Sequence, residues 1–146
     1  MKHHKLLVLI LFLAYTLPLL ARVEFEDLAV EVTGIEVETG NILVSLYDNK
    51  SGFPTDRKQA IKEFTIPARK NRVALNITGL SQNKDYAVAV CHDANGNEEC
   101  DTNFLGIPKE GVGVSNNAKG RFGPPSFEDS KFVFTWGKRI SIQVKY

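Results

Sequence analysis

Arg72-Val73-Ala74-Leu75-Asn76-Ile77 and Tyr86-Ala87-Val88-Ala89-Val90 decide the fold class, because large apolar side chains recur at every second position of both segments. A period of two places successive side chains on opposite faces of a β-strand, whereas a helix repeats its apolar positions every three or four residues. The second segment carries Ala87 and Ala89 on its other face, and such small side chains would let another layer approach closely. Both segments therefore predict strands of a layered β protein.

The same alternation continues toward both ends of the chain, and no long helical periodicity follows the first 21 residues. The expected strands cover residues 28–33, 42–46, 64–66, 73–77, 86–90, 132–136 and 140–146. Turn signals such as Gly40 and Gly137 separate them. About seven short strands joined in this way predict an all-β fold, a single antiparallel β-sandwich that is immunoglobulin-like or transthyretin-like in its layering. A β-barrel is the main alternative.

A long segment, residues 106–125, holds five of the chain's 11 glycines and three prolines. A stretch of this length is either a binding loop or a wrap over one end of the sandwich. Its glycines would let backbone approach a ligand closely, although glycines in a long loop more often serve its turns. They are Gly111, Gly113, Gly120 and Gly123. Aromatic side chains could stack on a sugar or peptide or form the underside of the wrap, and these are Phe104, Phe122 and Phe127.

The N-terminus has the layout of a secretory signal peptide over residues 1–21. Lys2 and Lys5 precede an apolar run that Pro18 interrupts, and Ala21 offers a cleavage position. The run is too short for a membrane anchor, which needs about 20 largely apolar residues. We therefore expect a periplasmic or secreted protein with one domain over residues 22–146 and no stable membrane insertion after cleavage.

Composition excludes several classes of function. Without residues 1–21, Lys plus Arg falls from 18 to 16 against 17 Asp plus Glu, a net charge of −1, so we expect no nucleic-acid partner. His92 is the one histidine outside the leader, and a multi-histidine zinc site is thereby excluded. Neither a phosphate-binding glycine loop nor a dinucleotide fingerprint occurs. Two cysteines in an exported chain favour one disulfide over reactive thiols.

The polar run from Cys91 to Phe104 contains both cysteines and is where any chemistry is expected. One interpretation is a β-hairpin, because Asn95-Gly96 is a strong two-residue turn signal. In that register Cys91 faces Cys100 in a non-hydrogen-bonded pair, whose close α-carbons suit a disulfide. Such a bridge would contribute about 2.5 to 3 kcal/mol in the chain-entropy model. The same register sets Asp93 opposite Glu98, a like-charge pair that a cation would relieve.

The other interpretation is a calcium loop, which makes calcium the candidate cofactor. Four side chains occupy positions one, three, five and nine of a series like that of an EF-hand, namely Asp93, Asn95, Asn97 and Asp101. Position six lacks glycine, and position twelve holds Phe104 in place of glutamate. Another residue would have to complete the shell, and the candidates are Glu110, Asn103 and Asp129. Hydrogen-bonded Asx turns without metal are the alternative.

These stretches also carry a family resemblance. The relevant segments are Gly40-Asn41-Ile42-Leu43-Val44-Ser45-Leu46-Tyr47, Tyr86-Ala87-Val88-Ala89-Val90, His92-Asp93-Ala94-Asn95-Gly96-Asn97, Asp101-Thr102-Asn103-Phe104-Leu105-Gly106-Ile107-Pro108, Glu110-Gly111 and Gly113-Val114-Ser115-Asn116-Asn117. Over most of residues 28–146 the chain resembles domain-of-unknown-function family 2141. The resemblance implies an exported bacterial β-sandwich and no established activity. Glu98 and Cys100 depart from the glycine and apolar residue usual in the family.

Two functions from different classes follow. The first is a noncatalytic exported binding or structural module, with residues 92–123 forming one end of the sandwich, calcium organising residues 92–103, and a protein or carbohydrate as the ligand. The second is a metal-dependent hydrolase in which His92 acts with Asp93, Asp101 or Glu110 around a metal-bound water. Catalytic metals need an open coordination position, which a shell of this kind does not provide, so we favour the noncatalytic module and expect no enzyme.

Overall fold

The computed structural model describes residues 27–146, which form an all-β sandwich; the predicted signal peptide lies outside these residues. The strands are β1 (Leu28–Ile35), β2 (Asn41–Tyr47), β3 (Lys62–Pro67), β4 (Asn71–Ile77), β5 (Asp85–Asp93), β6 (Gly111–Val114), β7 (Phe132–Val133) and β8 (Arg139–Gln143). Short helical turns are η1 (Arg57–Gln59), η2 (Ser115–Asn117) and α1 (Phe127–Ser130). Across the described residues no helix is long and apolar enough to cross a membrane.

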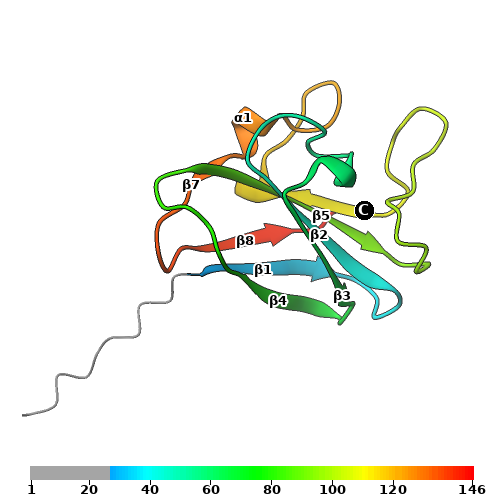
Figure 1. Cartoon of the computed structure of the whole chain (residues 1–146). Helices are drawn as coiled ribbons and strands as arrows, with labels where there is room; N and C mark the ends of the chain where they lie inside the picture. The colour runs from blue at the N-terminus through cyan, green and yellow to red at the C-terminus, as the bar shows by residue number, and fades with distance from the viewer. Residues whose placement is uncertain (1–26) are drawn as a thin grey trace, which may run out of the picture.

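The strands form two sheets. One has the order β4-β1-β8, and the other has the order β3-β2-β5-β6, with β7 paired to the start of β5. Figure 1 shows the first sheet below, with the strands of the second crossing it at an angle. Most neighbours are antiparallel as predicted, but β1 and β8 run parallel, with Val30 opposite Ile140. The predicted sandwich is therefore confirmed with one parallel pair.

The main core lies between the two sheets and contains the side chains that the period-two pattern singled out. Val30 and Val32 of β1 pack with Ile142 of β8 from one side, and Val44 of β2 and Val88 of β5 pack from the other. All of these side chains are buried. Burial of apolar surface is the dominant favourable term in folding, so these facing strands account for most of the stability of the sandwich.

A second apolar layer covers the outer face of β5. Ala87 and Ala89, whose small size predicted close approach, lie beneath Tyr47, Phe53 and Phe127. The rings of Phe53 and Phe127 meet edge to face with centroids 5.8 Å apart. Burial is the main cause that raises the pKa of Tyr47 to about 12. Phe127 is thus part of the wrap, as the second interpretation of the aromatic residues predicted.

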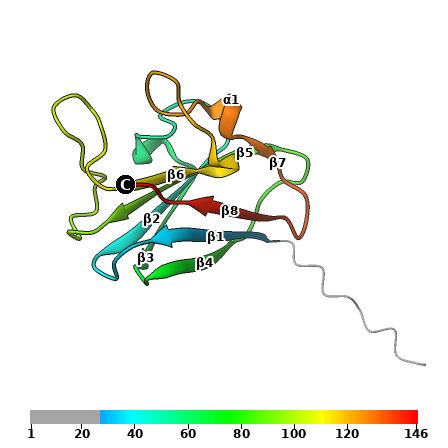
Figure 2. The same cartoon turned by 180° about the vertical axis from the view of Figure 1, so that it is seen from behind.

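The structure corrects the prediction of one long loop over residues 106–125, because strand β6 lies inside it. Val112 of β6 and Lys145 exchange two backbone hydrogen bonds of 2.8 and 2.9 Å, which join the edges of the two sheets. A Cβ atom on Gly111 would stand 2.4 Å from Cγ1 of Val144, and one on Gly113 would stand 2.7 Å from the carbonyl oxygen of Gln143. Gly111 and Gly113 lie in a strand rather than a turn, and they let the chain beyond β8 cross β6 closely (Figure 2).

The expected strand over residues 132–136 is also shorter than predicted. Only Phe132 and Val133 form β7, although Phe134 is buried in the core. Backbone hydrogen bonds then tie Phe134 to the turn before β5, since its N–H donates to Lys84 and its carbonyl accepts from Asn83. The alternation of Phe132 and Phe134 therefore reflects inward-facing side chains rather than a full strand.

Candidate functional site

The polar loop, residues 94–110, connects β5 to β6 and projects from the sandwich as the yellow-green segment in Figure 1. Asp93, at the end of β5, is completely buried and organises the start of the loop. Its Oδ1 accepts the backbone N–H groups of Gly96 and Asn97 at 2.7 and 3.1 Å, and its Oδ2 accepts that of Glu98 at 2.9 Å. One carboxylate therefore holds three successive backbone amides.

This arrangement shows that the predicted β-hairpin is wrong. A hairpin ladder would need backbone groups of residues 97–100 to pair with β5, whereas the Asp93 side chain takes two of those amides. On the edge of β5 away from β2, the antiparallel neighbour is instead β6, with Cys91 opposite Val112. Asp93 and Glu98 consequently do not form the expected like-charge pair, because Asp93 meets the amide of Glu98.

The predicted disulfide between Cys91 and Cys100 is present, with α-carbons 6.0 Å apart. This separation lies in the ordinary range for disulfides and does not need the close pair of a hairpin. The bridge ties the far side of the polar loop to the buried strand β5. Cys91, Cys100 and Glu110 offer atoms within 4.8 Å of one another, but the two sulfurs are bonded to each other and so are not free thiolates.

The other predicted metal ligands lie in the same loop as Asp93. Oδ2 of Asp101 accepts from Nδ2 of Asn95 at 2.7 Å, and Nδ2 of Asn97 reaches both oxygens of Asp101 at 3.2 and 3.3 Å. The amide oxygens of Asn95 and Asn97 accept the backbone N–H groups two residues further on. These are Asx turns, the arrangement given as the alternative to a cation. Calcium binding at these four residues stays a prediction.

Glu110 closes the base of the polar loop. Its Oε1 accepts the N–H of Ala94 and its Oε2 that of Asp101, each at 3.0 Å. Among the residues proposed to complete a calcium shell, Glu110 therefore lies with the loop, whereas Asp129 lies in α1, where it bonds Ser126. Glu110 thus holds both ends of residues 94–101, and Asp93 holds the amides between them.

His92 is completely buried, and both of its ring nitrogens have partners. Nε2 lies 2.9 Å from the carbonyl oxygen of Thr39, which can only accept, so Nε2 carries a proton. Nδ1 lies 2.5 Å from the hydroxyl of Tyr146 and accepts its hydrogen in the neutral ring. Neither nitrogen faces solvent, and a general base must reach the proton that it removes.

The tip of the polar loop, residues 103–107, is apolar and exposed. Phe104 is 94 % exposed, Leu105 69 % and Ile107 55 %. Asn103 stabilises this tip, because its Oδ1 accepts the N–H groups of Leu105 and Ile107 at 2.9 and 3.0 Å. The N–H of Asn103 donates to the carbonyl of Ile107, and that of Gly106 donates to the carbonyl of Asn103. The tip is a closed, hydrogen-bonded turn that presents apolar side chains outward.

A further group of residues, the clasp Ser115-Asn116-Asn117, has roles that the sequence pattern did not predict. The Ser115 hydroxyl accepts the N–H of Val88 and donates to the carbonyl of Ser130 at 2.6 Å. The side chain of Asn117 bonds the backbone of Ser141 and Gln143 in β8. The clasp, which forms η2, is therefore bonded to β5, α1 and β8, and this is a structural role.

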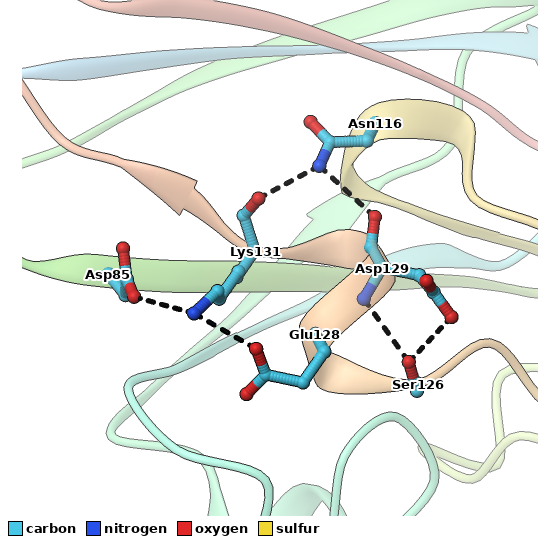
Figure 3. Close-up of polar contacts among 6 residues, drawn as sticks. All are labelled: Asp85, Asn116, Ser126, Glu128, Asp129 and Lys131. Atoms are coloured by element: carbon cyan, nitrogen blue, oxygen red, sulfur yellow. Dashed lines mark hydrogen bonds and ion pairs between the residues drawn. The ribbon is translucent and has the colours of Figure 1, made fainter.

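Asn116 holds α1, and Figure 3 shows its contacts. With a φ of +62°, it directs Nδ2 to the carbonyls of Asp129 and Lys131 at 3.2 and 2.9 Å. Ser126 caps the other end of α1 by accepting the N–H of Asp129. Nζ of Lys131 pairs with Glu128 and Asp85, which raises the pKa of this lysine. This second polar cluster is internally paired, and it fastens the wrap to β5.

Fold and loop together define a class: an all-β sandwich that carries a cross-linked polar loop with an apolar tip. The sequence model of one family matches residues 30–142, and its description is "Uncharacterized protein conserved in bacteria (DUF2141)". The chain belongs to this family, which confirms the resemblance seen in its motifs. No curated protein and no solved structure matches the chain.

Proposed function

We propose that this protein is an exported, noncatalytic binding module and that residues 103–107 are its binding element. The observation that supports this most is the contrast between the tip and its support. Three exposed apolar side chains stand on a turn that Asn103 holds, and the preceding part of the loop is fixed by the carboxylates of Asp93 and Glu110 and by a disulfide. Such an arrangement is preorganised, so binding would require little further ordering of the loop.

Exposed apolar residues are common on proteins when they stand singly. Here three of them, Phe104, Leu105 and Ile107, fall within four consecutive positions. These positions lie midway between Asp101 and Lys109, whose backbone groups are bonded to each other. A contiguous apolar patch that a protein keeps exposed marks an interaction site. The polar side chains of the family motif around this patch bond the loop itself, so they are not free to act on a substrate. This favours binding over catalysis.

Export is part of the proposal. The basic and apolar layout of residues 1–21 favours it. The disulfide also favours it, because such bonds persist in oxidising compartments such as the periplasm. The partner classes that the sequence favours are a protein or a carbohydrate in that compartment.

The competing function is the metal-dependent hydrolase built around His92. Its proposed base is buried, with one nitrogen bonded to Thr39 and the other to Tyr146. Its proposed metal ligands Asp93 and Asp101 accept hydrogen bonds from the loop. This geometry offers no open position for a water beside a base, so it supports the noncatalytic module.

The test compares wild-type protein with a variant in which Phe104, Leu105 and Ile107 are replaced by serine. Both proteins, without residues 1–21, are immobilised and exposed to cell-envelope fractions, with membranes, wall material and soluble extract kept separate. We expect one fraction to be retained by wild type and lost by the variant, with equal melting temperatures. Retention that is independent of these side chains would contradict the proposal, as would hydrolase activity that depends on added divalent ions and on Asp93.

A further inference from the structure

Four of the five backbone N–H groups at the tip of the polar loop are bonded inside the tip, which lowers the cost of an apolar surrounding. The N–H groups of Asn103, Leu105, Gly106 and Ile107 all donate to acceptors inside the tip itself. Pro108, which follows, has no N–H to satisfy. Backbone groups that enter hydrocarbon without partners cost several kcal/mol each, so these four bonds reduce that cost. The N–H of Phe104 has no such bond within the described residues, which keeps this part of the turn at the hydrated level of the headgroups.

The same feature disfavours a sugar as the partner. Carbohydrate sites combine a flat aromatic face with polar groups that bond the hydroxyls of the sugar. In the tip, Oδ1 of Asn103 already accepts two amides, and the neighbouring side chains of Phe104 and Leu105 are exposed. The tip therefore offers an apolar surface whose polar side chain is already bonded to the backbone.

A second loop carries another exposed aromatic residue. The Phe122 loop, residues 118–125, precedes α1, and the side chain of Phe122 is fully exposed. In Figure 1 it is the orange loop at the top, and the yellow-green polar loop extends upward beside it. Figure 2, from behind, shows both loops on that same side of the molecule, away from β4.

Positive charge flanks both apolar segments. Lys109 is the one charged residue within positions 102–109, and Lys119 and Arg121 are the charged residues of the Phe122 loop. All three are exposed, and none of them forms an ion pair within residues 27–146. The acidic groups of the polar loop precede or follow the tip: Glu98 and Glu99 are exposed before it, and Asp101 and Glu110 bond the loop itself.

We propose that residues 103–107 and the Phe122 loop dock on an anionic phospholipid bilayer, where Phe104, Leu105, Ile107 and Phe122 enter the interfacial region and Lys109, Lys119 and Arg121 meet the headgroups. This inference rests on the proposed function. It gives the binding module a lipid surface as its partner, in place of a protein or a carbohydrate. Aromatic side chains favour the level of the headgroups, and basic side chains are attracted to anionic lipid. With so few apolar side chains, the contact is peripheral and reversible and differs from the insertion of a spanning segment.

The first test is co-sedimentation of protein lacking residues 1–21 with vesicles of phosphatidylcholine, alone or mixed with phosphatidylglycerol. Each basic side chain beside an anionic surface contributes about fivefold to binding at low salt. We therefore expect Lys119→Gln with Arg121→Gln to weaken binding to the mixed vesicles about 25-fold. The matched control is Arg69→Gln with Lys70→Gln, which removes two exposed charges between β3 and β4 and should change binding less than about twofold.

The apolar contribution needs its own variant. Replacing Phe104, Leu105 and Ile107 by serine should weaken binding at least about tenfold, because each side chain removes apolar surface from the interface. Trp136→Ser is the control, since Trp136 is 49 % exposed on the β7–β8 connection, away from both loops. Phe104→Trp in a Trp136→Phe background should shift the tryptophan emission to shorter wavelength on the mixed vesicles.

The outcomes separate this inference from the proposed function. Wild-type protein that ignores the mixed vesicles or binds both vesicle types equally would overturn membrane docking, as would an unshifted emission from Phe104→Trp in the Trp136→Phe background. If the serine variant then still loses its partner in a soluble or wall fraction, the binding module stands with a different partner. If the serine variant behaves as wild type with vesicles and with every envelope fraction, both proposals fall.

Discussion

The hydroxyl of Tyr146 lies 2.5 Å from Nδ1 of the buried His92, and the two rings meet edge to face with centroids 5.9 Å apart. The hydroxyl also accepts the N–H of Glu36 at 3.3 Å. Tyr146 thus connects the start of the β1–β2 turn to the end of β5. His92, the residue that sequence reasoning considered as a catalytic base, forms part of this internal connection.

Tyr146→Phe should destabilise the protein by about 1 to 3 kcal/mol, because it leaves Nδ1 of His92 buried without a donor. Chemical denaturation at neutral pH measures this change. His92→Phe in the Tyr146→Phe background removes the unsatisfied ring nitrogen and should recover part of the loss, while the Thr39 carbonyl loses its donor and limits the recovery. An unchanged midpoint for Tyr146→Phe would contradict the contact.

Gly111→Ala should also lower stability, by about 1 to 3 kcal/mol, because the added methyl group overlaps Val144 and Tyr146. Gly123→Ala is the matched control, since nothing lies within 4 Å of its added Cβ. Thermal melts of both variants decide the point. Equal melting temperatures would show that the crossing of β6 by the chain beyond β8 is looser than described.

Asp93→Ala should cost about 2 to 4 kcal/mol, because three amides lose a buried acceptor. Asp101→Ala should cost less than about 1 kcal/mol, because Asp101 is partly exposed and water can replace it. Denaturant midpoints at one ionic strength compare the two variants. Similar losses at both positions would indicate that the two carboxylates act together, as they would around a shared cation.

Calcium itself can be tested by a thermal melt with and without chelator. If the internal hydrogen bonds of Asp93, Asn95, Asn97 and Asp101 satisfy the polar loop without a metal, chelator leaves the melting temperature unchanged. A protein that binds calcium in the folded state would instead melt lower when the ion is removed. Such a drop, abolished in Asp93→Ala, would establish the calcium loop.

The sequence predicted those parts of the fold that depend on local pattern. Alternation at Val30, Val44 and Val88 placed these side chains in the core, and small residues at Ala87 and Ala89 indicated a layer on the outer face. The disulfide was predictable because two cysteines in an exported chain have few alternatives.

The features that were missed depend on partners far away in the sequence. Gly111-Val112-Gly113-Val114 reads as loop because glycine is depleted in strands, and only the crossing chain after β8 explains it. The hairpin signal at Asn95-Gly96 was strong, but the buried carboxylate of Asp93 took the amides that the ladder needed. The clasp at Ser115 and Asn117 bonds backbone 15 and 24 residues away, which no local pattern reveals.

The central claim is that the polar residues and the disulfide hold residues 103–107 in one conformation before any partner binds. The most direct measurement is NMR relaxation of the backbone amides of Leu105 and Ile107 in the free protein. We predict order parameters close to those of β5, about 0.85, and a fall in both after Asn103→Ala. Values below about 0.6 in the wild-type protein would show a flexible tip and would contradict the account.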